Sequence, residues 1–434
     1  MFKLIKTHPL IYLLFLTPFF VIPGIAIVEL SVIIITLIFL LKNRNLEYYK
    51  DIKFLFLLLY SIYVATNAFF QIDDDLKFSS FFFFRYVLFS LSIFFILDLY
   101  KNIPNFSKKK ILFFYLVICF FIFFDSYLQF FTGKNLFGFE IIRATVSSIF
   151  GSELILGSFL LKLLPITLFL FFYSNINIKD NSLLLIIFLS LFFSVVFIAG
   201  GRTPFFLMLL FILLIIFFIR DLRFIFNLST LLLVLFIIST LIFEFGKSKP
   251  GNRMFIKTFD QMTNYIFTKT ENQIVEEKND INKKEIIKNI KVFSSNHNGH
   301  YILAYDLFKK NPIFGIGPKG FRHYCRGVDY DPPIGICSTH PHNFLIQILS
   351  ETGLLGFLFY IFGIIFVVVK LFQAYIRKED NIEKNYFLVI SIGLIINFFP
   401  FVPNGNFFNN WISITSFYYI GIYLYSYKRL FYNL

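Results

Sequence analysis

The chain has 434 residues, of which 57% are hydrophobic, 21% aromatic and only 15% charged, and its mean hydropathy is +0.74. A water-soluble core of ordinary proportions cannot bury that much apolar surface, so these values exclude a soluble globular protein and indicate an integral membrane protein. The net charge of +14 is explained by membrane topology and by contact with anionic lipid headgroups, and does not call for nucleic acid as a partner.

Apolar runs along the chain predict the membrane-spanning segments. A helix needs about 20 apolar residues to cross a hydrocarbon core of roughly 30 Å. About twelve such runs are present, with approximate cores at 8–22, 25–41, 54–70, 79–98, 111–131, 154–173, 183–198, 204–219, 224–244, 343–371, 385–402 and 407–426. The first two are short and are also compatible with one re-entrant pair. We therefore predict an all-α, polytopic bundle of about 12 transmembrane helices.

Basic residues in the short loops predict the orientation of this bundle. If twelve spans alternate, these residues, for example Lys108, Lys109 and Lys110, all fall on one side, which is then cytoplasmic. Both termini are cytoplasmic in this arrangement. The chain then divides into nine helices over 1–245, one large extracytoplasmic loop domain over 246–342 and three helices over 343–434.

The large loop contains two of the three cysteines, Cys325 and Cys337. An oxidising compartment permits a disulfide between them, which would contribute on the order of 3 kcal/mol by restricting the unfolded chain. The rival hypothesis is a zinc site that uses both cysteines together with His340 and His342. Its spacing matches none of the usual patterns of paired zinc ligands, so the disulfide is favoured.

Two cations, Arg85 and Lys162, fall within predicted spans. A cation at this depth costs roughly 2.5–3.5 kcal/mol, so such residues face a cavity or a partner. Arg85 and Asp125 lie at similar depths in successive spans. A structural Arg85–Asp125 ion pair and a role of Arg85 in substrate binding are therefore both open.

Several motifs resemble those of one known family. They are Gly315–Arg322 (GIGPKGFR), Thr339–Asn343 (THPHN), the later Gln347 and Glu351 with Gly353-x-x-Gly356, and Gly200-Gly201-Arg202 at the outer end of an earlier span. Together with the long loop before a late helix, these motifs resemble the O-antigen ligase superfamily. That superfamily includes O-antigen ligases, Wzy-type polymerases and protein O-oligosaccharyltransferases.

The resemblance implies a GT-C-like glycosyltransferase of the bacterial inner membrane whose active site faces the periplasm. Such an enzyme moves a glycan from undecaprenyl pyrophosphate to an acceptor hydroxyl and inverts the anomeric carbon. The acceptor is lipid A-core for a ligase, which we favour, or a second carrier-linked glycan for a Wzy-type polymerase. No cofactor or metal is expected, because a solvated loop explains Asp73-Asp74-Asp75, the one local group of carboxylates. A transporter or flippase is the alternative from another class, but it has no evident need for an external base.

The resemblance also assigns roles to residues. His342 is the expected general base, because an imidazole of ordinary pKa near 6.5 is half-ionised close to neutral pH, and His340 is the fallback. Arg202 is the expected contact of the pyrophosphate, and the alternative is an interfacial anchor whose guanidinium reaches the lipid headgroups. Further substrate contacts are expected from Arg322, Arg85 and Lys162. Asn343 and Gln347 are expected either to bind a sugar as substrate contacts or to orient the histidine.

One departure from the family pattern concerns the segment Ser294–Tyr305. Members of the family carry an arginine just before an amphipathic helix there, whereas this chain offers His297 and His300. His300 is therefore a candidate substrate contact in place of the arginine. Arg253 or Arg326 is the alternative source of that charge.

Overall fold

The computed structural model describes residues 9–43, 46–71, 83–256, 258–259, 295–325, 337–378 and 381–432. Regular structure within these ranges is helical, which confirms the predicted all-α class. The elements are α2 (Pro9–Leu16), η1 (Thr17–Val21), α3 (Ile25–Lys42), η2 (Leu46–Lys50), α4 (Ile52–Gln71), α6 (Phe84–Leu99), α7 (Asn105–Thr132), η3 (Ser148–Phe150), α8 (Leu156–Tyr173), α9 (Ser182–Ile198), α10 (Arg202–Phe218), η4 (Arg220–Leu222), α11 (Arg223–Ile242), η5 (Asn252–Ile256), α14 (Ser295–Lys310), α15 (Gly320–Tyr324), α16 (Phe344–Ile376), α17 (Ile382–Asn397) and α18 (Asn410–Tyr432).

Six described helices are long and apolar enough to cross a membrane, namely Ile25–Lys42, Ile52–Phe70, Asn105–Thr132, Leu156–Tyr173, Arg220–Ile242 and Phe344–Ile376. The runs Pro9–Val21, Ser182–Ile198 and Arg202–Phe218 are apolar but shorter. The chain is thus a membrane protein, and the count of 12 spans stays a prediction. Of the predicted loop 246–342, residues 257, 260–294 and 326–336 lie outside the described residues.

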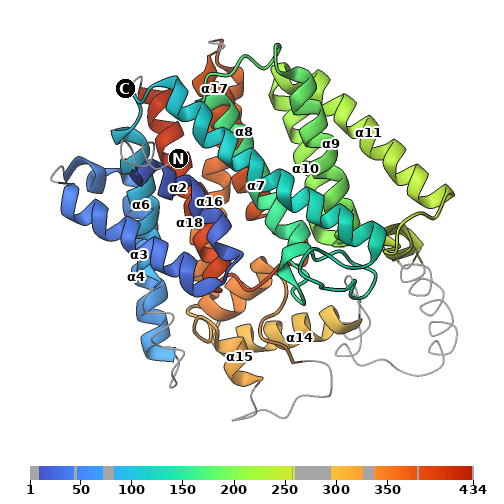
Figure 1. The fold of residues 1–434 in the computed structure, drawn as a ribbon. Helices are drawn as coiled ribbons and strands as arrows, with labels where there is room; N and C mark the ends of the chain where they lie inside the picture. The colour runs from blue at the N-terminus through green and yellow to red at the C-terminus, as the bar shows by residue number, and fades with distance from the viewer. Residues whose placement is uncertain are drawn as a thin grey trace, which may run out of the picture.

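Helices α8, α16 and α18 pack against α17 and form one group with it. Helices α3, α4 and α6 pack on the α18 side of this group, and α9, α10 and α11 pack on the side of α8 (Figure 1). In α8, 89% of the apolar window is buried inside the protein, which marks it as a core helix. Helices α14 and α15 lie across one end of the bundle, and the C-terminus lies near the opposite end (Figure 1).

Basic residues at the ends of α16, α17 and α18 lie at the end of the bundle that carries the C-terminus. Lys428 pairs with Asp98 at 3.1 Å, and Arg429 pairs with Glu383 at 3.3 Å. The Lys384 ammonium donates to the Arg377 carbonyl at 2.7 Å. That this end faces the cytoplasm stays a prediction from the sequence.

The predicted Arg85–Asp125 ion pair is wrong. Arg85 in α6 instead pairs with Glu29 in the adjacent α3 at 2.9 Å, and the Tyr86 hydroxyl donates to the same carboxylate at 2.7 Å. Asp125 in α7 accepts from the Ser148 hydroxyl at 2.5 Å and anchors the loop that follows α7. Similar depth in two spans does not make residues neighbours, because packing of α3 against α6 brings a nearer carboxylate.

Helix α16 is interrupted at Gly353, whose φ of 61° and ψ of −166° are not helical. The interruption frees carbonyl groups of the preceding turn to accept bonds from another segment. Ile316 N donates to Ser350 O at 3.0 Å, and Gly317 N donates to Glu351 O at 2.9 Å. The glycine-rich motif is thereby bonded to the first part of α16, which begins beside His342.

The other side of the interruption is bonded in the same way. Leu354 N donates to Pro312 O at 2.9 Å, and Leu355 N donates to Ile313 O at 3.3 Å. A Cβ at Gly353 would lie 2.3 Å from the Ile313 carbonyl oxygen, and one at Gly315 would lie 2.5 Å from the α16 backbone. Only glycine allows so close a backbone approach, which explains both positions in physical terms.

Candidate functional site

A cavity of about 730 Å³ opens between α8, α10, α17, the start of α18 and the segments around 319–322 and 339–344. Among the residues that line it are His342, His340, Lys162, Lys319 and Arg322. Three cations and two imidazoles, which come from distant parts of the sequence, thus converge on one space. We take this cavity as the candidate active site.

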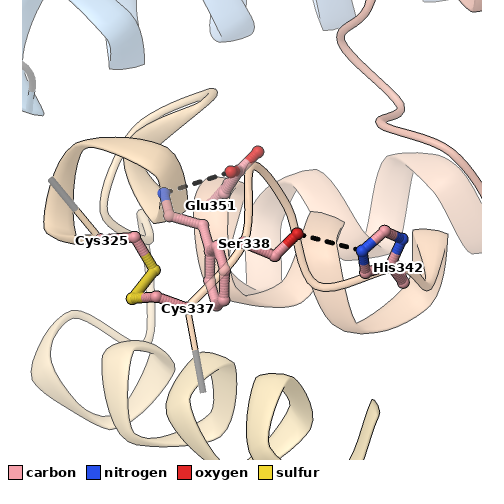
Figure 2. The surroundings of a disulfide bond; sticks show 6 residues. Cys325, Cys337, Ser338, His342 and Glu351 are labelled. Atoms are coloured by element: carbon pink, nitrogen blue, oxygen red, sulfur yellow. Dashed lines mark hydrogen bonds between the residues drawn. A yellow bond between two sulfur atoms is a disulfide. The ribbon is translucent and has the colours of Figure 1, made fainter. Parts of the chain in front are cut away.

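His342 is held at the wall of this cavity by an unusual backbone and by its neighbours. Its φ of 59° is in the left-handed region, where few non-glycine residues occur unless their surroundings hold them. Its carbonyl accepts from Asn404 N at 2.8 Å. Its Nε2 lies 3.0 Å from the Ser338 hydroxyl oxygen, as Figure 2 shows. Within the described residues the Nδ1 atom has no hydrogen bond, and the residue itself lines the cavity.

Other histidines surround this imidazole. The ring centre of His340 lies 4.1 Å from that of His342, and those of His300 and His297 lie 5.4 Å and 5.7 Å away. Burial, and then repulsion by His300 and His297, lowers the pKa of His342 to about 4. The prediction from an ordinary pKa is therefore corrected, since the imidazole is neutral rather than half-ionised at neutral pH.

His340 is buried, and both of its ring nitrogens have partners. Nδ1 lies 2.9 Å from the Thr339 hydroxyl, and Nε2 lies 3.3 Å from the Asn404 carbonyl, to which it must donate. Burial above all, then repulsion by His342, lowers its pKa to about 3. A free imidazole has a pKa of 6.5, so between about pH 6.5 and 4 both histidines are protonated in the unfolded chain but still neutral in the folded one. The unfolded chain therefore binds more protons than the folded chain, and the folded state loses stability as the pH falls through that range. Because the hydrogen bonds to Thr339 and Asn404 occupy both ring nitrogens, His340 is a positioning residue rather than a base.

Asn343 and Gln347 do not line the cavity but hold its walls together. The Asn343 side chain caps α16 by accepting from Ile346 N at 3.1 Å, and its amide donates to the Pro400 carbonyl at 2.8 Å. Gln347 donates to Glu351 at 2.9 Å and to Asn406 at 2.9 Å. Both residues therefore join the start of α16 to the 400–407 segment, which fits orientation of the histidine motif better than direct sugar contact.

The disulfide joins Cys325, directly after α15, to Cys337, which precedes Ser338 (Figure 2). The bridge thereby places the hydroxyl that contacts His342. Because the two sulfurs are bonded to each other, the alternative zinc site is not formed in this structure. On the other side of the bridge, Phe321 N donates to the buried Glu351 carboxylate at 3.2 Å.

The cavity carries positive charge. Lys319 and Arg322 enter it from the glycine-rich segment, and Lys162 enters from α8, where its ammonium bonds to the Asn397 carboxamide. None of the described residues that line the cavity is Asp or Glu. Burial lowers the pKa of Lys319, while attraction by Glu351 opposes the shift. The space therefore suits an anionic ligand.

Arg202 lies just outside the cavity wall, although its neighbours Thr203 and Pro204 are part of it. Its guanidinium donates to the Arg253 carbonyl at 3.2 Å, and the Arg253 guanidinium donates to the Arg143 carbonyl at 3.1 Å. Burial, and repulsion by Arg202 and Arg143, lowers the pKa of Arg253. We call Arg143, Arg202 and Arg253 the arginine cluster.

The remaining residues that the sequence predicted for the site do not line the cavity or lie outside the described residues. Arg85 is engaged with Glu29 and does not line the cavity. His300 is buried in α14 against His342, and it does not line the cavity either. Arg326 and Asp73-Asp74-Asp75 lie outside the described residues.

Sequence reasoning missed Lys319, Arg143 and the asparagine-rich wall from Asn404 to Trp411. Lys319 lies within the glycine-rich motif Gly315–Arg322, but no role was predicted for it. A run of polar residues between two apolar helices was the only signal of the wall.

Comparison with known proteins gives one family. The model of the family described as O-antigen ligase matches residues 185–361, which span α9 to the middle of α16 and include His342, Arg322 and Arg202. No protein in the curated collection matches the chain. Lys162 and the 397–411 wall lie outside the matched range.

Proposed function

We propose that this chain is a membrane glycosyltransferase that moves a glycan from undecaprenyl pyrophosphate to an acceptor hydroxyl, because residues 185–361 match the model of the O-antigen ligase family. We place it in the bacterial inner membrane, with the cavity on the periplasmic side and lipid A-core as the acceptor. The observation that carries the proposal is the His342 imidazole on the wall of a cavity that is lined by three basic side chains and by no described carboxylate.

In the proposed step the acceptor hydroxyl oxygen attacks the anomeric carbon, and the bond from that carbon to the pyrophosphate oxygen breaks. The hydroxyl proton moves to Nδ1 of His342, and undecaprenyl pyrophosphate leaves with the bonding electrons. This assignment requires the tautomer in which Nε2–H donates to Ser338, a bond of 3.0 Å. Attack opposite the leaving group inverts the anomeric carbon.

A pyrophosphate leaving group needs positive charge where little water competes. Lys319 and Arg322 supply it inside the cavity, and the arginine cluster supplies it at the rim beside Thr203. In this proposal Arg202 contacts the pyrophosphate, and Arg253 provides the charge that the 294–305 segment lacks. Bound pyrophosphate would also raise the pKa of His342 above its value in the free protein, because opposite charge favours the imidazolium.

The proposal is tested with purified protein in nanodiscs and an undecaprenyl-pyrophosphate oligosaccharide as donor. Lipid A-core and a second molecule of the donor serve as the two acceptors. A glycosylated lipid A-core supports the ligase, whereas a lengthened carrier-linked glycan supports a Wzy-type polymerase. Absence of both products, under conditions in which the protein stays folded, would refute glycan transfer. A His342→Ala protein serves as the inactive control.

A further inference from the structure

One wall of the cavity is built from residues 404–411, which comprise the end of the connection from α17 to α18 and the first two residues of α18 and contain four asparagines and a tryptophan. The carboxamides of Asn404 and Asn406 are committed to the protein. The first donates to Phe399 O at 2.9 Å, and the second accepts from Phe408 N at 2.9 Å. These bonds give the segment a fixed shape.

The next two asparagines keep hydrogen-bonding capacity that the protein does not use. The Asn409 side-chain oxygen accepts from Trp411 N at 3.4 Å, but its amide has no bond within the described residues. The Asn410 carboxamide forms no hydrogen bond at all in the part of the chain that the structure describes. Each of these residues lines the cavity, and a carboxamide offers two donors and two acceptor sites there.

Trp411 stands beside them as part of the same wall and is partly exposed. The Lys162 ammonium lies 5.4 Å from its ring centre, and the bond from Lys162 to Asn397 holds that ammonium in place. A large flat ring, next to unused carboxamides and a cation, combines an apolar face with polar groups at its edge.

These groups match the chemistry of a pyranose ring. The C–H bonds on one side of a pyranose form an apolar face that stacks on an aromatic ring, and its hydroxyl or acetamido groups both donate and accept hydrogen bonds. We propose that Trp411, Asn409 and Asn410 form a sugar subsite, in which the indole carries the pyranose and the two carboxamides bind its polar substituents. This subsite rests on the proposed function and specifies how the cavity recognises its glycan.

The chain contains one tryptophan, so tryptophan emission reports on this subsite alone. The wild-type protein in detergent micelles, which contribute no tryptophan of their own, is titrated with an undecaprenyl-pyrophosphate oligosaccharide, with undecaprenyl pyrophosphate that carries no sugar, and with lipid A-core. A change in emission with the oligosaccharide donor assigns the subsite to the donor sugar, and a change with lipid A-core assigns it to the acceptor sugar. The sugar-free carrier should cause no change.

Variants separate this subsite from the catalytic step. Loss of stacking in Trp411→Ala should raise the KM of the glycan substrate about three- to tenfold and leave kcat nearly unchanged, and Trp411→Phe should retain most of the affinity. Asn410→Ala should raise the same KM about two- to tenfold. Phe401→Ala is the matched control, because Phe401 is 68% exposed in the same connection and does not line the cavity.

Two results would overturn the subsite. One is a protein that transfers glycan although neither glycan-bearing lipid changes its emission, or whose emission changes equally with the sugar-free carrier. The other is a wild-type KM in Trp411→Ala. Both leave the proposed function intact, whereas a protein that transfers no glycan to any acceptor contradicts the function itself.

Discussion

Replacing Gly353 by alanine should detach the glycine-rich segment from α16 and lower the transfer rate at least tenfold without any change in the chemical groups of the cavity. A non-glycine residue at φ 61° and ψ −166° costs roughly 1–3 kcal/mol in backbone strain. The new Cβ would also lie 2.3 Å from the Ile313 carbonyl oxygen, so the backbone must move apart. Four inter-segment hydrogen bonds are then at risk, each worth about 1 kcal/mol.

We therefore expect Gly353→Ala to destabilise the segment by at least about 3 kcal/mol, since strain and lost bonds act together. The same helix offers a matched control in Gly363, where an added Cβ meets only the Phe56 ring at 3.9 Å. Alanine should be neutral or stabilising there by up to about 1 kcal/mol, because it favours helix.

The assay measures Tm and transfer rate for wild type, Gly353→Ala and Gly363→Ala in the same nanodiscs. Gly353→Ala should lose at least tenfold in rate at a temperature where the helices remain folded, and Gly363→Ala should keep the wild-type rate. If the two variants match each other in both measurements, the interruption of α16 does not support the site and the reasoning is refuted.

His342→Ala should abolish transfer with nearly unchanged Tm, and a wild-type turnover would remove His342 as the base. If His342 is the base, kcat/KM should stay constant between about pH 6 and 8 and fall only toward pH 4, where His342 becomes protonated in the free protein. The decrease of kcat on the acid side should occur at a higher pH, because bound pyrophosphate raises the pKa of His342. Arg202→Lys should lose most activity, since an ammonium cannot reproduce the planar, bidentate contact of a guanidinium with phosphate, and near-wild-type transfer would make Arg202 an anchor. Cys325→Ser should leave Cys337 as a free thiol, lower Tm and slow transfer. The disulfide closes a loop with a sequence separation of 12, and its loss costs about 3 kcal/mol. Unchanged transfer rates would show that Ser338 is positioned without the disulfide.

The helices were predictable from the sequence because apolar length is a local property. Each predicted apolar run coincides with a helix, and the largest error in a start is at α7, which begins at Asn105 instead of 111. The early turn contains Lys108, whose ammonium lies 4.4 Å from the Tyr173 ring centre. The aliphatic part of such a lysine side chain packs on a neighbouring helix, so the helix can extend beyond its apolar run. Hydropathy counts the lysine only as a charged residue and therefore misses this extension.

The arrangement of side chains was less predictable, because it depends on which helices are neighbours. Residue type and depth suggested Asp125 as the partner of Arg85, but packing of α3 on α6 supplied Glu29 instead. The sequence motifs drew attention to His342 and Arg322, and the structure places both on one cavity.

The Trp411 wall was missed for the same reason. It reaches the cavity only through the fold, from about 70 residues further along the chain than His342.

The interruption at Gly353 divides α16 into two helical parts that are attached to one segment. The first part, Phe344–Thr352, is about two and a half turns long and is bonded through its backbone to residues 316–317 and through Asn343 to residue 400. The second part begins at Leu354 and is bonded through its first two amides to residues 312–313. Residues 312–317 therefore bridge the interruption, and backbone bonds to this loop, in addition to the helix itself, set where His342 lies.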